Sequence, residues 1–320
     1  MSAKPTPPKT IDALPAHWTD RLPAAAQPYA RLSRLDRPIG WQLLFLPCLM
    51  GIALAETQEG FWGDDATLAI ALLVGAIAMR GAGCTWNDIL DRDIDAKVKR
   101  TALRPIPAGQ ISVREAALWM AAQCGVGLLV LPTLPRVAQI VALAAVPLVA
   151  AYPLMKRVPW WPQAWLGFCF SWGALVSMAA VRGTVTRESV LLWAGCVAWT
   201  IAYDTIYALQ DVEDDALVGV RSTARLFGAN WRRWTVGFYI AALCLWAGAA
   251  AMMGAALWTG AALGAVGAFL VWPTLERIQD TEPETALAAF KKNAWVGLAV
   301  VGAFALQGVW QTLAPLWRAP

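Results

Sequence analysis

Charged residues are scarce in this chain. They make up 15% of its 320 residues, whereas hydrophobic residues make up 58%, and the mean hydropathy is +0.49. This balance excludes an ordinary soluble globular protein and indicates a chain that crosses a membrane several times, with the lipid bilayer as its surroundings. The formal net charge is only +4, without the basic surface that nucleic acids require, so we expect no nucleic-acid partner.

Histidine and paired cysteines are also lacking. The single histidine, His17, falls in the N-terminal tail, and we expect it to be solvated. The six cysteines form no CxxC pair, which argues against a metal or redox role and favours small packing residues. Residues 1–37 are rich in Pro and Ala and lack both the apolar core of a secretory signal and the Arg/Ser bias of an organellar transit peptide. We therefore expect the first span to act as its own insertion signal.

Long apolar runs are what the chain has in abundance. Each is close to or above the length that crosses a bilayer as a helix. They cover residues 39–56, 66–86, 113–133, 136–154, 164–182, 189–210, 233–253, 255–275 and 293–314. The sequence thus predicts an all-α polytopic membrane protein with nine transmembrane helices, in which the division near Gly254 is the least distinct.

The connections between these runs alternate in charge. Basic residues gather in the N-terminal tail and in four further connections, at residues 97–104, 156–157, 221–233 and 291–292. Because basic loops stay inside, the N-terminus is predicted to be cytoplasmic, in a bacterial inner (cytoplasmic) membrane. Residues 1–37 would form a cytoplasmic tail with a short interfacial helix, 38–315 the membrane domain, and 316–320 a periplasmic tail.

Two acidic stretches interrupt the apolar pattern at predicted cytoplasmic helix ends. Nine of the 22 acidic residues fall within residues 87–95 and 203–215. Asn87, Asp91 and Asp95 are spaced by four, as are Asp211 and Asp215, so on helices each set forms a row of oxygen ligands. Oxygen ligands in this arrangement suit Mg²⁺ together with substrate phosphate oxygens.

Each acidic row extends back into its apolar run. Arg80 shares a helical stripe with Asn87 and Asp91, and Asp204 shares one with Asp211. Arg80 either neutralises the neighbouring acids or binds an anionic substrate group, because its planar fork matches a carboxylate or phosphate.

A basic pair, Lys156 and Arg157, lies between the two acidic stretches, four and five residues after Tyr152. It serves either as a topology signal or as a partner for the charge of a departing diphosphate, to which the Tyr152 hydroxyl would donate a further hydrogen bond.

These strings resemble the UbiA superfamily of intramembrane prenyltransferases, and within it the 4-hydroxybenzoate polyprenyltransferases of ubiquinone biosynthesis. The resemblance covers most of the predicted bundle. It rests on Leu-Asp-Arg-Pro-Ile-Gly at 35–40, Arg-Gly-Ala-Gly-Cys-Thr-Trp-Asn-Asp at 80–88, Lys-Arg-Thr-Ala-Leu-Arg-Pro at 99–105, Tyr-Pro-Leu-Met-Lys-Arg at 152–157, and Tyr-Asp-Thr-Ile-Tyr at 203–207 with the acids that follow.

The resemblance implies a nine-helix bundle with a central cavity that is capped on the cytoplasmic side. It also implies Mg²⁺-dependent transfer of a polyprenyl group from polyprenyl diphosphate to 4-hydroxybenzoate, at the ring carbon ortho to the hydroxyl. The implied roles are metal binding by Asn87, Asp91, Asp95, Asp211 and Asp215; catalysis by Asp91, Asp95, Asp211, Asp215 and Asp204; diphosphate binding by Lys156, Arg157 and Tyr152; and acceptor binding by Arg37 and Arg80.

Three other functions compete with this interpretation. A related enzyme with another acceptor, such as homogentisate, another quinone precursor or haem, would differ around Arg37 and Arg80. An ion-coupled transporter would place its acids near mid-membrane rather than at helix ends. A soluble isoprenyl synthase also uses paired aspartate motifs, but the nine apolar runs exclude it.

Overall fold

The computed structural model describes residues 16–61, 63–97, 101–155, 160–255, 257–279 and 282–318. Within these ranges every regular element is a helix. The chain divides into two compact units, of which unit 1 holds residues 1–41 and 74–130, and unit 2 holds residues 42–73 and 131–320. Helices α2 (Ile39–Ala55) and α3 (Gly63–Asp95) each contribute to both units.

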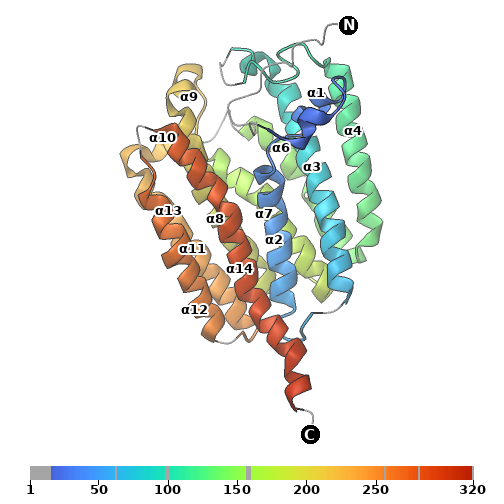
Figure 1. The fold of residues 1–320 in the computed structure, drawn as a ribbon, viewed down its shortest axis with the longest axis vertical. Helices are drawn as coiled ribbons and strands as arrows, with labels where there is room; N and C mark the ends of the chain where they lie inside the picture. The colour runs from blue at the N-terminus through green and yellow to red at the C-terminus, as the bar shows by residue number, and fades with distance from the viewer. Residues whose placement is uncertain are drawn as a thin grey trace. The chain divides into compact units, whose positions relative to one another are not determined.

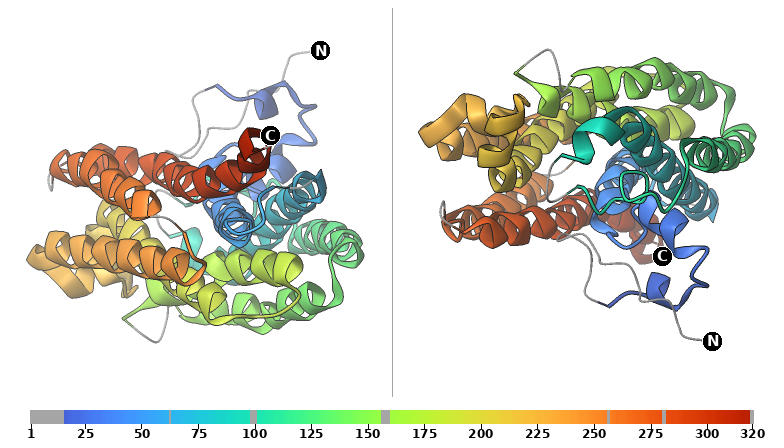
Figure 2. Two further views of the ribbon diagram at one scale, coloured as in Figure 1. Left: turned by 90° about the horizontal axis from the view of Figure 1, so that it is seen from below. Right: turned by 90° about the horizontal axis from the view of Figure 1, so that it is seen from above.

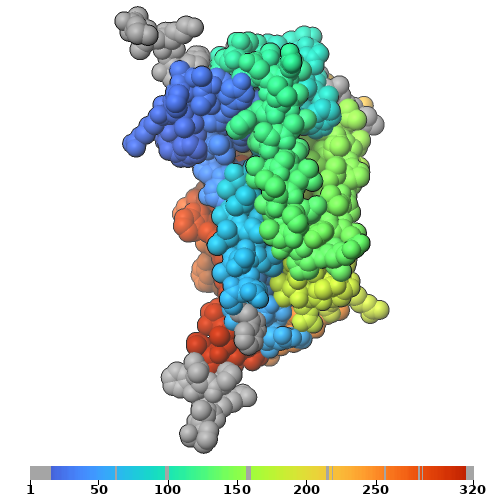
Figure 3. Space-filling model, turned by 90° about the vertical axis from the view of Figure 1, so that its right-hand side faces the viewer, coloured from blue at the N-terminus to red at the C-terminus, as the bar shows by residue number. Residues whose placement is uncertain are grey.

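In unit 1 the N-terminal segment packs against α3 and α4 (Val113–Val130). These two helices lie side by side in Figure 3. The segment begins with the 3₁₀ helix η1 (Trp18–Arg21) and continues into α1 (Gln27–Leu32). Leu32 is fully buried in an apolar cluster that includes Ile89 of α3 and Ala116 of α4. Polar contacts join the same three elements, because the Ser33 hydroxyl donates to Gln123 Oε1 of α4 at 3.0 Å and Gln123 Nε2 donates to Thr85 Oγ1 of α3 at 3.4 Å.

Unit 2 is built around α8 (Arg187–Ala208), which packs against α7 (Pro162–Arg182), α11 (Trp231–Met252) and α14 (Pro283–Arg318) (Figure 1). The Trp199 side chain of α8 is completely buried. Its indole N–H donates to Asn293 Oδ1 of α14 at 2.8 Å, and its ring meets Trp246 of α11 edge-on at 5.9 Å. Helix α8 is therefore joined to α11 by aromatic packing and to α14 by a buried hydrogen bond.

The remaining elements of unit 2 are mostly long helices, which Figure 2 views from both ends. They are η2 (Leu131–Thr133), α5 (Arg136–Ala144), α6 (Val146–Met155), α7 (Pro162–Arg182), η3 (Leu209–Asp211), α9 (Val212–Val218), α10 (Thr223–Phe227), η4 (Gly228–Asn230), α11 (Trp231–Met252), α12 (Leu257–Val266), the π-helical segment η5 (Gly267–Val271), α13 (Trp272–Glu276) and α14 (Pro283–Arg318).

The apolar helices confirm a multi-pass membrane protein. Eight helices of the described chain are long and apolar enough to cross a membrane, and the 17-residue α2 is a shorter apolar helix at the first predicted span. The least distinct predicted boundary, at Gly254, is real: α11 ends at Met252, Gly254 has φ +73°, and α12 begins at Leu257. A positive φ costs glycine little, which explains why the chain turns there.

Close packing of α2 on α7 depends on Gly51. A Cβ atom built there would lie 2.0 Å from Ser177 Oγ and 3.0 Å from the Ala174 carbonyl oxygen. We therefore expect Gly51→Ala to destabilise the protein by about 2 kcal/mol through overpacking, although alanine favours a helix. Thermal unfolding in detergent measures this effect. Gly248→Ala is the matched control, because no atom lies within 4 Å of its added Cβ. A Gly51→Ala variant as stable as Gly248→Ala would contradict the expectation.

Candidate functional site

The first acidic motif lies on one unbroken helix. Asn87, Asp91 and Asp95 all belong to the last turns of α3, so their spacing of four places them on one face. The Asp91 and Asp95 residues are buried, with 9% and 6% of their surface exposed. The predicted row of oxygen ligands is thus present in unit 1, at the C-terminal end of α3.

Asp88 is the most buried acid of this motif. No role for it was predicted from the sequence. It is 0% exposed, and Arg34 Nη2 donates to both of its carboxylate oxygens at 2.7 and 2.8 Å. Arg104 Nη1 donates to Asp88 Oδ1 at 3.2 Å and to Asp95 Oδ2 at 2.6 Å. Asp88 precedes Asp91 by three residues and Asp95 by seven, spacings that bring it to the same side of α3 as Asp95, and Arg104 contacts both carboxylates.

Arg34 adopts an unusual backbone conformation to reach Asp88. Its φ is +56°, a left-handed value that glycine adopts far more readily than arginine. The turn ends α1, with the Arg34 N–H bonded to the Arg31 carbonyl and the Leu35 N–H bonded to the Ala30 carbonyl, both at 3.0 Å. This is the pattern in which a helix normally ends on glycine. Arginine replaces glycine here, and its side chain gains the buried ion pair with Asp88.

The connection between α3 and α4 folds back over the end of the first motif. Thr101 Oγ1 donates to the Asp95 carbonyl at 2.9 Å, close to the Arg104–Asp95 ion pair. A capping box begins α4, because the Ser112 N–H donates to Glu115 Oε2 at 2.8 Å and the Glu115 N–H donates to Ser112 Oγ at 3.2 Å. Residues 98–100 lie outside the described chain.

The two predicted acceptor-binding arginines lie in unit 1. Gly40, three residues after Arg37, faces the Arg80 guanidinium so closely that an added Cβ would be 2.8 Å from Arg80 Nε. Arg37 Nε lies 3.6 Å from Asp36 Oδ2. The structure thus places Arg80 against the short segment that carries Arg37, which is the Leu35–Gly40 string of the sequence.

The second acidic motif belongs to unit 2 and is less regular than the first. Asp204 lies within α8, but Asp211 ends the 3₁₀ turn η3, and Asp215 belongs to α9. Gln210 Nε2 donates to the Tyr207 carbonyl at 2.9 Å where the α-helical pattern changes. A 3₁₀ turn therefore separates Asp204 from Asp211, so the row predicted from their spacing does not lie on one continuous α-helix.

The predicted diphosphate-binding residues are described only in part. Tyr152 is half-buried near the end of α6. Lys156 and Arg157 lie outside the described residues, as does the side chain of Asp215.

The side-chain oxygens of Asn87, Asp91 and Asp95 on α3 can supply only part of the coordination shell of Mg²⁺. Among the described residues, no group of three or more His, Cys, Asp or Glu side chains is arranged to hold a metal ion by itself. Mg²⁺ usually binds through one or two carboxylates and completes its shell with water and substrate phosphate oxygens. The buried Asp91, between Asn87 and Asp95 on one face, is suited to that kind of binding.

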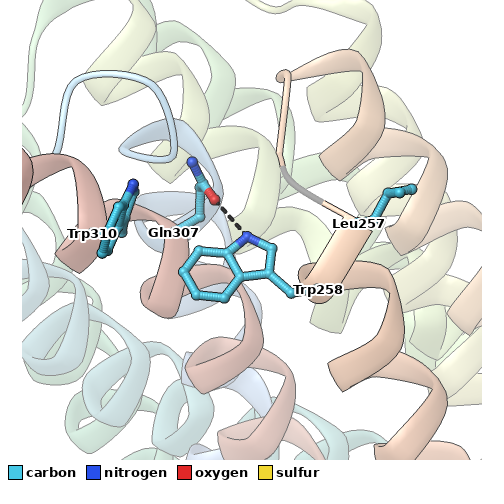
Figure 4. Close-up of a pocket in the computed structure, with 4 residues that line it drawn as sticks. All are labelled: Leu257, Trp258, Gln307 and Trp310. Carbon is cyan, nitrogen blue, oxygen red and sulfur yellow. Dashed lines mark hydrogen bonds between the residues drawn. The ribbon is translucent and has the colours of Figure 1, made fainter.

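A separate pocket of about 460 Å³ in unit 2 contains none of the predicted site residues (Figure 4). Leu257, Trp258, Gln307 and Trp310 line it, and the Trp258 indole N–H donates to Gln307 Oε1 at 2.9 Å. Without a charged side chain in its lining, this pocket is unsuited to diphosphate chemistry.

Comparison with known proteins gives a consistent result. The model of the UbiA prenyltransferase family matches residues 44–298. The chain is 44% identical over 299 residues to the mitochondrial 4-hydroxybenzoate polyprenyltransferase of Drosophila pseudoobscura pseudoobscura, covering 93% of this chain and 73% of the relative. It is 42% identical to the human enzyme of the same name over 293 residues, covering 91% of this chain and 78% of the relative.

Solved structures support the fold. A UbiA homolog from Archaeoglobus fulgidus bound to GPP and Mg²⁺ superposes with a TM-score of 0.64 at 18% identity, covering 88% of this chain and 99% of that one. The apo UbiA homolog from Aeropyrum pernix K1 gives a TM-score of 0.63 at 23% identity, covering 82% and 96%.

Proposed function

Because the chain belongs to the UbiA prenyltransferase family, we propose that it transfers a polyprenyl group from polyprenyl diphosphate to 4-hydroxybenzoate in ubiquinone biosynthesis. The new bond forms at the ring carbon ortho to the hydroxyl, and diphosphate is released. The observation that carries this proposal is 42–46% identity, over most of the chain, to relatives that bear that name.

The acidic residues bind the diphosphate through Mg²⁺ in this proposal. Asn87, Asp91 and Asp95 present oxygens on the end of α3, while Asp211 and Asp215 form the second motif. When bound, Mg²⁺ supplies positive charge to the leaving diphosphate. Lys156, Arg157 and the Tyr152 hydroxyl contribute further positive charge and a hydrogen bond, which favours breakage of the allylic C–O bond.

The acceptor is held by arginine in the same proposal. Arg80, packed on Gly40, and Arg37 bind the carboxylate of 4-hydroxybenzoate, because a guanidinium can donate two parallel hydrogen bonds to it. The ring carbon ortho to the phenol then attacks the allylic carbon, and Asp204 takes the role of a polar contact or of the base that removes the ring proton. The apolar helices keep water away from the electron-poor allylic carbon.

Gly40→Ala tests the acceptor role of Arg80. The added Cβ, 2.8 Å from Arg80 Nε, displaces the guanidinium but leaves the α2 backbone in place, because a long side chain moves more easily than a helix. We expect the KM for 4-hydroxybenzoate to rise about tenfold, the cost of one charged hydrogen bond, with the KM for the prenyl diphosphate unchanged. Gly83→Ala is the control, since nothing lies within 4 Å of its Cβ. Equal rises in both KM values would reassign Arg80 to the diphosphate.

The location of the protein is also a proposal. We infer a bacterial inner membrane with a cytoplasmic N-terminus, supported by the basic loops. The named relatives are mitochondrial.

The experiment that tests the activity uses membranes that contain the full chain. Radiolabelled 4-hydroxybenzoate and a polyprenyl diphosphate are added with Mg²⁺ or with a chelator, and the label that enters the organic phase is counted. Mg²⁺-dependent transfer supports the proposal. Donor binding without transfer to 4-hydroxybenzoate would direct the search to homogentisate, another quinone precursor or haem as the acceptor.

A further inference from the structure

A second pocket in unit 2 carries charged side chains that the prenyl-transfer proposal does not use. It has a volume of about 290 Å³ and is lined by Ala55, Glu56, Glu59, Val181 and Arg182. It therefore combines two carboxylates and one guanidinium with two apolar residues in a space of the size that holds a small polar group.

Glu56 is the unusual member of this lining. It is only 5% exposed, although it follows the last residue of α2 directly. In the described part of the chain, no hydrogen bond or ion pair joins the side chains of Glu56, Glu59 or Arg182 to another group of the protein. Glu56 is thus a largely buried residue whose carboxylate opens into the pocket without a hydrogen bond, with Arg182 as the cation of the same lining, and such a carboxylate points to a further partner.

The lining indicates the charge of that partner. Carboxylates favour a cation, and the C-terminal ends of α2 at Ala55 and α7 at Arg182 add partial negative charge beside them. Arg182 favours an anion in the same pocket. Its positive charge argues against a bare metal ion, and the described residues contain no group of three acidic, His or Cys side chains suited to one.

The place of the pocket in the fold indicates the chemical class. Glu56 and Arg182 mark the points where apolar helices end, and such points lie at the level of lipid headgroups. We propose that this pocket binds the headgroup of a zwitterionic phospholipid, with Arg182 on the phosphate and Glu56 and Glu59 on the ammonium. The lipid would fasten the end of α2 to the end of α7.

The ionisation of Glu56 agrees with this arrangement. Burial, together with the nearby Asp65 and Glu59, raises the pKa of Glu56 to about 7, and Arg182 opposes the rise. The carboxylate is therefore half protonated near neutral pH. An ammonium group favours the ionised form, so lipid binding should strengthen as the pH rises from about 6 to about 8.

The test is lipid binding by the full chain in detergent, counted by native mass spectrometry and followed by thermal unfolding. The probes are phosphatidylethanolamine, phosphatidylglycerol and diacylglycerol with the same acyl chains, together with soluble phosphoethanolamine. We expect phosphatidylethanolamine to bind about tenfold more tightly than phosphatidylglycerol, and diacylglycerol to give no stabilisation.

Variants assign the effect to the pocket. Glu56→Gln and Arg182→Gln should each weaken phosphatidylethanolamine binding about tenfold. Glu59→Gln, at an exposed position that tolerates substitution, should weaken it less, and the exposed Arg187→Gln, at the start of α8, should not change it. Equal binding of both phospholipids, equal effects of Arg182→Gln and Arg187→Gln, or equal stabilisation by soluble phosphoethanolamine would each overturn the proposal.

Discussion

Asp91→Asn is expected to lower the rate of prenyl transfer by about 10³-fold or more, because it removes a negative charge from the centre of the proposed Mg²⁺-binding face while keeping the shape of the side chain. Asp91 is the middle member of the row formed with Asn87 and Asp95, and it is 9% exposed. In the proposed function this side chain contacts the metal when diphosphate is bound, so we expect its loss to affect the reaction rather than the fold. Initial rates at saturating substrate and Mg²⁺ measure the effect.

Asp93→Asn is the matched control for this experiment. Asp93 lies two residues further along α3, but its side chain is 80% exposed and lies 3.5 Å from Arg92. The same change of charge at this position should leave the rate within a factor of about two, because a surface ion pair contributes little. Both variants should reach the membrane in normal amounts and unfold at the temperature of the unmodified protein. An Asp91→Asn enzyme as active as Asp93→Asn would refute the metal-binding assignment of the α3 face.

The sequence predicted the features that depend on the length and hydropathy of a segment or on residues that lie close together in the chain. Length and hydropathy identified the membrane helices because hydrocarbon thickness sets the length of a span. The fourfold spacing of Asn87, Asp91 and Asp95 placed them on one helical face because α3 continues without interruption to Asp95.

Features that depend on distant partners were not predicted. Arg34 occupies a helix-ending position where local rules favour glycine, and its reason for being there, Asp88, lies 54 residues away. The change of helix type between Asp204 and Asp211 was not predicted either. The chain changes to a 3₁₀ turn at Leu209–Asp211, where the Gln210 side chain bonds to the Tyr207 carbonyl, and apolar periodicity does not report such a change.

Asp88→Asn should destabilise the protein more than the other substitutions considered above. It leaves the Arg34 guanidinium, whose side chain is 9% exposed, without its bidentate anionic partner, and it also removes one contact of Arg104. Breaking a buried ion pair from one side costs about 3–5 kcal/mol, because the remaining charge stays buried. The strained backbone of Arg34 would then persist without the interaction that compensates for it. Thermal unfolding in detergent at a fixed lipid content measures the loss.

The partner variant Arg34→Gly separates the ion pair from the backbone strain. Glycine suits the left-handed φ of +56° at this position, and Asp88 keeps Arg104 at 3.2 Å, so this variant should lose less stability than Asp88→Asn. The double variant Asp88→Asn with Arg34→Gly should be more stable than Asp88→Asn alone, because position 34 then carries no guanidinium that has lost its ion pair with Asp88. If the losses of the two single variants simply added, the buried pair would have no coupling energy. The left-handed turn at Arg34 would then need another explanation than its contact with Asp88.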